Sequence, residues 1–122
     1  MTGYLPPGWP ADVRPPGATD WESTATAYLL DCCPPDFRRY PVLRRHPVVL
    51  ARFASHFVAG QCDAAQIAVA LIRTELAEQV SSEVVAAAAD AWLEQGARLQ
   101  RVRRGVRLVE EALQGVSFVP KL

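Results

Sequence analysis

A seven-residue apolar repeat dominates the C-terminal part of the chain. Two interleaved rows of apolar side chains recur there, with one polar interruption at Gln95. The rows are Val85, Trp92, Leu99, Val106 and Leu113, and Ala88, Val102, Val109 and Val116. This spacing is typical of a helix that packs by knobs-into-holes against another helix. The Ser81-Ser82-Glu83 run supplies an N-cap and Gly115 a C-cap, so the pattern predicts a helix over about residues 82–115.

A second long helix is predicted over about residues 47–79. Pro47 suits its first position, and no further proline interrupts it. Its predicted packing row is Leu50, Phe53, Phe57, Gly60, Ala64, Ile67 and Leu71. The short Ser81-Ser82 joint makes the two helices antiparallel, so a helical hairpin follows. We favour a continuous helix through residues 59–63; a break there would give a compact bundle of four or five helices instead.

A shorter helix is predicted over about residues 20–33. Thr19 and Glu22 have the spacing of a capping box, in which a hydroxyl and a carboxylate satisfy the first backbone N–H groups. One face then collects apolar side chains at helical intervals, namely Trp21, Ala25, Tyr28, Leu29 and Cys32. Pro34 and Pro35 end this helix. The four prolines of residues 34–47 leave room for one or two helical turns before the hairpin begins.

The first 18 residues form a proline-rich arm, which we expect to be extended or polyproline-like. Five prolines lie within residues 1–16, and proline fixes φ and donates no backbone hydrogen bond. Tyr4, Leu5 and Trp9 are costly to leave in water, so we expect the arm to pack on its own domain. The alternative is a ligand for a proline-binding partner through Pro7-x-x-Pro10. The fold class is therefore all-α: an arm (1–18) and a single helical domain (19–122).

Composition and charge narrow the class of protein. The chain has 122 residues, of which 50% are hydrophobic and 21% charged, enough for one domain with a real core. Thirteen basic and thirteen acidic residues balance, which excludes a globally basic nucleic-acid binder. No stretch reaches the length of a membrane-spanning helix, and the N-terminus lacks the pattern of a signal peptide. An odd set of three cysteines predicts a reduced, cytoplasmic protein.

The second long helix is more apolar than one packing partner requires. Between Phe53 and Ile72 its only formal charge is Asp63. A helix of this kind is buried on several sides. The N-terminal helix and the arm can cover part of it, and a second copy of the chain can cover the rest. The sequence therefore predicts a non-catalytic interaction or oligomerisation module, with a homodimer as the expected assembly and another protein as the alternative partner.

An arginine-rich loop before the second long helix is the alternative functional site. Its candidate residues are Arg38, Arg39, Arg44, Arg45 and His46. Free N–H groups at a helix N-terminus favour anions, and arginine forks bind phosphate or carboxylate through two hydrogen bonds. The chain would then be an anion-binding protein for phosphate, a nucleotide, nucleic acid or an acidic partner. The competing interpretation is that these side chains pair with Asp31, Asp36 or a glutamate of the last helix and only hold the loop.

A second basic run lies on the last helix. Its members are Arg98, Arg101, Arg103, Arg104 and Arg107. At 100° per residue they spread over most of the side away from the apolar seam. Glu94 can pair with Arg98, and Glu110 or Glu111 with Arg107. We expect a solvated, partly paired surface, and the less favoured interpretation is that this run binds nucleic acid or an acidic protein partner.

No motif in the chain predicts catalysis or a cofactor. Zinc-site spacings such as CxxC and HExxH, the nucleophile elbow, the P-loop, the GxGxxG loop and the paired Glu-x-x-His of di-iron bundles do not occur. The vicinal pair Cys32-Cys33 is best interpreted as small buried side chains. We therefore expect no metal site, no cofactor and no enzymatic activity.

The N-terminal part of the chain resembles a group of small uncharacterised proteins from high-GC actinobacteria. The motifs that carry the resemblance are LPPGWP at residues 5–10, PPG at 15–17, CPPD at 33–36 and YPVLRRHP at 40–47. Together they span a little over a third of the chain. The resemblance implies a bacterial cytoplasmic protein and supplies no functional residue to carry over.

Overall fold

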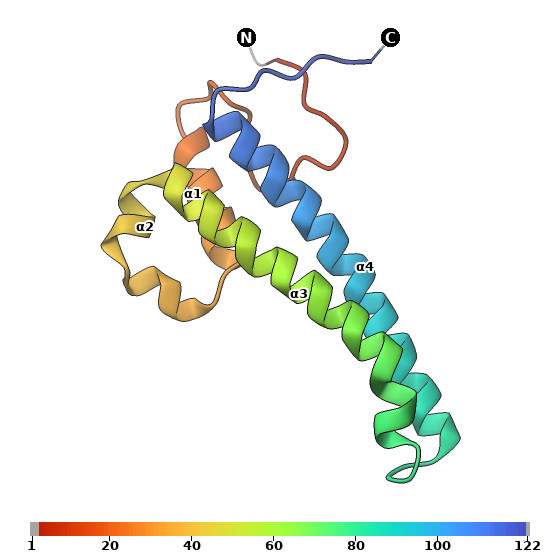
Figure 1. The fold of residues 1–122 in the computed structure, drawn as a ribbon. Helices are drawn as coiled ribbons and strands as arrows, with labels where there is room; N and C mark the ends of the chain where they lie inside the picture. Colours follow the sequence, from red (N-terminus) through yellow and green to blue (C-terminus); the bar gives the residue numbers. More distant parts are fainter. Residues whose placement is uncertain (1–2, 122) are drawn as a thin grey trace.

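A computed structural model describes residues 3–121, and all regular secondary structure in this part of the chain is helical, as predicted. The long hairpin consists of α3 (Pro47–Leu76) and α4 (Ser82–Leu113). α1 (Trp21–Asp31), the 3-10 helix η1 (Pro35–Arg39) and α2 (Pro41–Arg45) precede it. Figure 1 shows these short elements gathered at one end of the hairpin, while the turn between α3 and α4 stands clear of them.

α3 is continuous, and local capping sets both ends of α4. α3 runs without a break through residues 59–63, so the continuous helix is confirmed. The Ser81 hydroxyl accepts a hydrogen bond from the Val84 N–H at the start of α4. At the other end Gly115 has a φ of +90°, and the N–H groups of Gly115 and Val116 donate to the carbonyls of Ala112 and Glu111. This Schellman arrangement satisfies carbonyls that the helix leaves open.

The packing row of α3 differs from the predicted one. The side chains buried on α3 are Leu50, Ala51, Ala54, Val58, Cys62 and Ala65. Of the predicted row only Leu50 is buried, whereas Phe53, Ile67 and Leu71 remain 45%, 59% and 45% exposed. The prediction was wrong because it followed the bulky residues. Small side chains let two helices approach closely, and a Cβ added to Gly96 of α4 would lie 3.8 Å from the Ala65 Cβ.

The α4 row lies where the heptad pattern puts it. Val85, Leu99, Val106 and Val109 are buried, and Trp92, Val102 and Leu113 are half-buried. Val116, the last predicted member, lies beyond the end of α4 and is 46% exposed. Polar side chains occupy much of the rest of α4, so its periodicity selects a single face. α3 offers apolar residues on several faces and gives no such selection.

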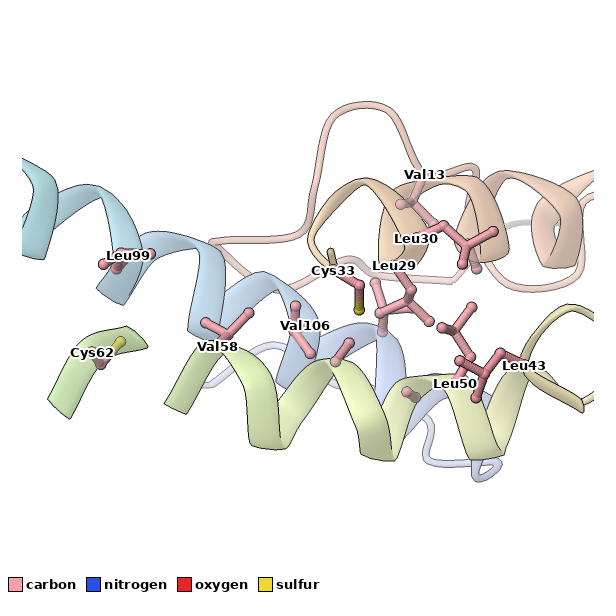
Figure 2. Close-up of a cluster of buried hydrophobic side chains, with 14 of the residues drawn as sticks. Val13, Leu29, Leu30, Cys33, Leu43, Leu50, Val58, Cys62, Leu99 and Val106 are labelled. Atoms are coloured by element: carbon pink, nitrogen blue, oxygen red, sulfur yellow. The ribbon is translucent and has the colours of Figure 1, made fainter. Parts of the chain in front are cut away.

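The short elements close the core at the end of the hairpin away from the turn. Figure 2 shows Leu29 of α1, Leu43 of α2 and Leu50 of α3 meeting in one cluster, with Cys62 and Leu99 further along the hairpin. The predicted capping box at Thr19 does not form. Asp20 is the N-cap of α1 and makes no side-chain cap hydrogen bond.

The N-terminal arm is a chain of tight turns and is not extended. The Trp9 N–H donates to the Pro6 carbonyl and the Ala18 N–H to the Pro15 carbonyl, while Gly8 and Gly17 have φ near +95°. Proline followed by a glycine of positive φ is the signature of a type II turn. The arm contributes the buried Val13 to the core.

Gly105 of α4 is the point where α1 and the arm meet the hairpin. A Cβ added to this buried residue would lie 2.5 Å from the Tyr28 hydroxyl oxygen and 3.1 Å from Cγ of Pro10. No larger residue fits without displacing one of them. Nearby, the Arg104 Nε donates a 2.8 Å hydrogen bond to the Pro7 carbonyl.

We expect Gly105→Ala to lower the free energy of unfolding by about 1–2 kcal/mol, because overpacking outweighs the better helix propensity of alanine. Urea denaturation followed by circular dichroism measures this. Gly96→Ala is the matched control on the same helix, since its Cβ meets only an ordinary contact, and we expect it to stabilise the protein. Adding Tyr28→Phe to Gly105→Ala should restore part of the loss. Equal stability of the two alanine variants would contradict this account of the junction.

Candidate functional site

Arginine side chains from both long helices surround a polar recess of about 460 Å³ between α3 and α4. Arg52 and Ser55 of α3 line one wall. Arg103, Arg104 and Arg107 of α4 line the other, and Gln100 and Glu110 complete the recess. The recess exists because a small side chain, Ser55, faces long arginines that extend toward solvent.

One ion pair closes the recess at the end near the short elements. Arg52 Nε lies 2.6 Å from Glu110 Oε2, and Arg52 Nη2 donates a 3.1 Å hydrogen bond to Glu110 Oε1. The Nε contact is close but not aligned as a hydrogen bond, so it acts as charge pairing. The Glu110 side chain is buried, and the half-exposed Arg52 compensates the cost of burying its carboxylate.

The other arginines of the recess lack an anionic partner. Within residues 3–121, neither Arg103 nor Arg107 lies within ion-pair distance of a carboxylate, and Arg104 donates only to the Pro7 carbonyl. Arg103 and Arg107 are four residues apart on α4, where like charges repel each other. The recess therefore holds four guanidinium groups against one carboxylate.

The predicted basic run of α4 is divided by the fold. Arg103, Arg104 and Arg107 reach the recess, whereas Arg98 lines a different recess beside α1. The exposed Arg101 belongs to neither. The pairs expected along α4 do not form among the described residues: Arg98 donates to the Gln95 amide oxygen, and Glu110 pairs with α3 in place of Arg107. The expected partly paired surface is thus replaced by pairing across the hairpin.

Arg52 is absent from the residues predicted to form a site, although the sequence holds a usable signal for it. Arg52 lies 29 positions before Ser81, and Glu110 lies 29 positions after it. In an antiparallel hairpin that turns at Ser81, such positions face each other. The hairpin register therefore predicts that Arg52 lies opposite Glu110. It also places Arg107, one turn before Glu110 on α4, close to Arg52.

The arginine-rich loop does not form one cluster of free cations. Arg38 forms an ion pair with Asp31, as the competing interpretation expected, and the Arg39 guanidinium lies 5.6 Å from the centre of the Tyr40 ring. Arg44 and Arg45 are exposed on the last turn of α2. His46 is the N-cap of α3 and makes no side-chain cap hydrogen bond. Anion binding by Arg44, Arg45 and His46 stays a prediction.

The vicinal cysteines lie in a recess of about 450 Å³ between α1 and the hairpin. Burial, together with the neighbouring Cys32 thiol, raises the pKa of Cys33 to about 11. Burial also raises the pKa of Cys32 and that of the Tyr28 hydroxyl beside it. A thiol is nucleophilic as its thiolate, so neither cysteine is activated at neutral pH.

On the α1 side of the hairpin an apolar surface continues beyond α1. Phe57 of α3 and Val102 of α4 lie on this side, next to α1. Ala64 and Leu71 follow Phe57 at seven-residue intervals along α3 toward the turn. Gln95 and Ala88 precede Val102 at the same intervals along α4. We call this surface the tip face; its members are Ala64, Ala68, Leu71, Ala88, Ala91, Trp92 and Gln95. The last four line a shallow recess of about 410 Å³.

The described residues were also compared with two kinds of feature, a membrane-spanning helix and a metal-binding cluster. No helix of residues 3–121 is long and apolar enough to cross a membrane. In the same part of the chain, no three histidine, cysteine, aspartate or glutamate side chains gather closely enough to hold a metal ion.

Comparison of the chain with protein-family models, with curated proteins and with solved structures finds no match. The resemblance to actinobacterial proteins therefore stays a prediction, and the site has to be interpreted from its own geometry.

We expect Cys33 to react slowly with a thiol-specific reagent in the folded protein. At pH 8 a pKa of about 11 leaves on the order of one thiol in a thousand ionised. Labelling followed by peptide mass analysis should show a rate that rises about tenfold per pH unit. The same reaction in concentrated urea is the control and should be fast. Labelling of the folded protein at the urea rate would show that the thiol is neither buried nor shifted.

Proposed function

We propose that the protein is a non-catalytic helical interaction module that forms an antiparallel homodimer through the tip face. The observation that carries the proposal is the apolar surface that α1 covers at one end of the hairpin and leaves uncovered at the other. A location in the cytoplasm goes with this proposal, supported by three cysteines that are all free thiols.

The lengths of the helices support a second copy as the missing cover. At 1.5 Å per residue, α3 and α4 are about 45 and 48 Å long, whereas α1 is about 16 Å long. Figure 1 shows the turn end of the hairpin projecting past α1 and α2. Two such ends laid side by side in opposite directions form a four-helix bundle, which is a stable way to bury two apolar faces.

The side chains of the tip face suit self-packing. Ala64, Ala88 and Ala91 are small, Leu71 is 45% exposed, and Trp92 is half-buried at the edge of the face. Alternation of small and large residues lets facing helices interdigitate. Ile67, at 59% the most exposed large side chain of the predicted row, extends the apolar surface onto the outer side of α3.

The charge distribution favours the antiparallel orientation. Residues 63–97, which include the turn, carry six acidic residues and one basic residue, whereas residues 98–107 of α4 carry five arginines. In a parallel dimer the acidic ends would face each other. In the antiparallel dimer each acidic end lies toward the partner's Arg98, which lines the α1 side of the hairpin, and this favours the register and steers association.

We expect the wild-type protein to have a solution mass of about 27 kDa, twice the 13.4 kDa of one chain, by light scattering or sedimentation. Leu71→Glu places a charge in the proposed interface and should weaken the dimer by about a hundredfold or more. Ala91→Glu on α4 should do the same. High salt should also weaken the dimer, because it screens the charge pairing between the two copies.

Leu93→Glu is the matched control for Leu71→Glu. Leu93 is 56% exposed, but it lines an apolar recess with Gln66 and Val69 on the other side of the hairpin. It should leave the dimer intact, and circular dichroism should show that all variants keep their helices. A wild-type monomer at every concentration would overturn the proposal, and so would dissociation caused equally by Leu93→Glu.

A further inference from the structure

We propose that the arginine recess between α3 and α4 binds the phosphate chain of a small polyphosphorylated molecule such as a nucleoside di- or triphosphate. This site is independent of the proposed dimer, because it lies on the opposite side of the hairpin. Ser55 is two residues from Phe57, which corresponds to about 200° around α3, and Phe57 lies on the α1 side.

The recess has the size of a small-molecule site. Its volume of about 460 Å³ lies within the range of ligand pockets, about 300–1,000 Å³. Its walls belong to two long helices packed against each other, so the backbone of the recess is in place before any ligand arrives. Binding then orders exposed arginine side chains but no loop.

The charges of the recess fit a compact anion that carries several charges. Arg52 is held by Glu110, which leaves the three arginines of α4 as the excess positive charge. Glu111, one turn beyond Arg107, does not neutralise this charge through an ion pair, because none of the ion pairs in the described chain includes it. A di- or triphosphate carries about this amount of opposite charge, and guanidinium groups bind phosphate oxygens through pairs of hydrogen bonds.

The placement of Arg103 and Arg107 points to a ligand and not to the fold, whereas Arg104 also holds the arm through the Pro7 carbonyl. Gly96, Arg103 and Glu110 are seven residues apart and form one row along α4. Gly96 lies next to Ala65 of α3 and Glu110 is buried, so this row faces α3. A row that packs on a partner helix normally places apolar side chains at such a position. Arg107, one turn away, adds a like charge that destabilises the empty helix. An anion between the two arginines would remove this cost.

Isothermal titration calorimetry at low ionic strength tests the proposal with four probes: inorganic phosphate, pyrophosphate, ATP and AMP. We expect pyrophosphate and ATP to bind at submillimolar concentration, and phosphate and AMP to bind at least about tenfold more weakly. The double variant Arg103→Gln/Arg107→Gln should weaken pyrophosphate binding by about tenfold or more, because it removes two charge-assisted contacts. Without ligand, this variant should melt at the same temperature as the wild type or slightly higher.

The matched control removes two exposed arginines that lie outside the recess, in Arg73→Gln/Arg101→Gln, and should leave pyrophosphate binding within about twofold of the wild type. Equal loss in both double variants would reduce the effect to general charge and overturn the proposal. Loss of binding in Arg44→Gln/Arg45→Gln with none in the double variant of the recess would move the site to the loop and overturn it too. So would an absence of binding by pyrophosphate and ATP at about 5 mM.

Discussion

The close approach of α3 to α4 through small side chains determines how the rest of the molecule is arranged. Ala54, Val58, Cys62 and Ala65 fill the contact, and these mostly small side chains let the helices lie close together. Interiors are packed as densely as organic crystals, so a contact of this kind fixes the rotation of each helix about its axis. Once α3 is rotated so that its small residues face α4, its large residues have to face elsewhere.

That rotation gives the two sides of the hairpin different surfaces. On one side Phe57 and Val102 receive α1, and the apolar surface continues to the turn. On the other side Arg52 pairs with Glu110 and the arginines of α4 surround a polar recess. A protein of zero net charge thereby acquires a local excess of positive charge, which its overall composition does not reveal.

The sequence predicts the hairpin well and the rotation of α3 poorly, for a physical reason. α4 has polar residues on most faces, so its heptad pattern selects one seam, and the buried Val85, Leu99, Val106 and Val109 lie on it. α3 is apolar almost all round, so periodicity cannot choose among its faces. The turns of the arm were also missed. The prolines taken alone suggest an extended chain. The glycine that follows each proline pair is the local signal that instead fixes a type II turn.

The functional residues follow the same division between local and long-range information. Arg103 and Arg107 are visible as a basic run, but their relation to Arg52 depends on the register of a hairpin that joins residues 58 positions apart. Gly105 shows the same dependence, because the docked Tyr28 and Pro10 explain why a glycine occupies this position inside a long helix. Helix propensity would favour alanine there. The glycine is retained where tertiary contact outweighs local preference, and this contact holds the short elements at one end and leaves the tip face open at the other.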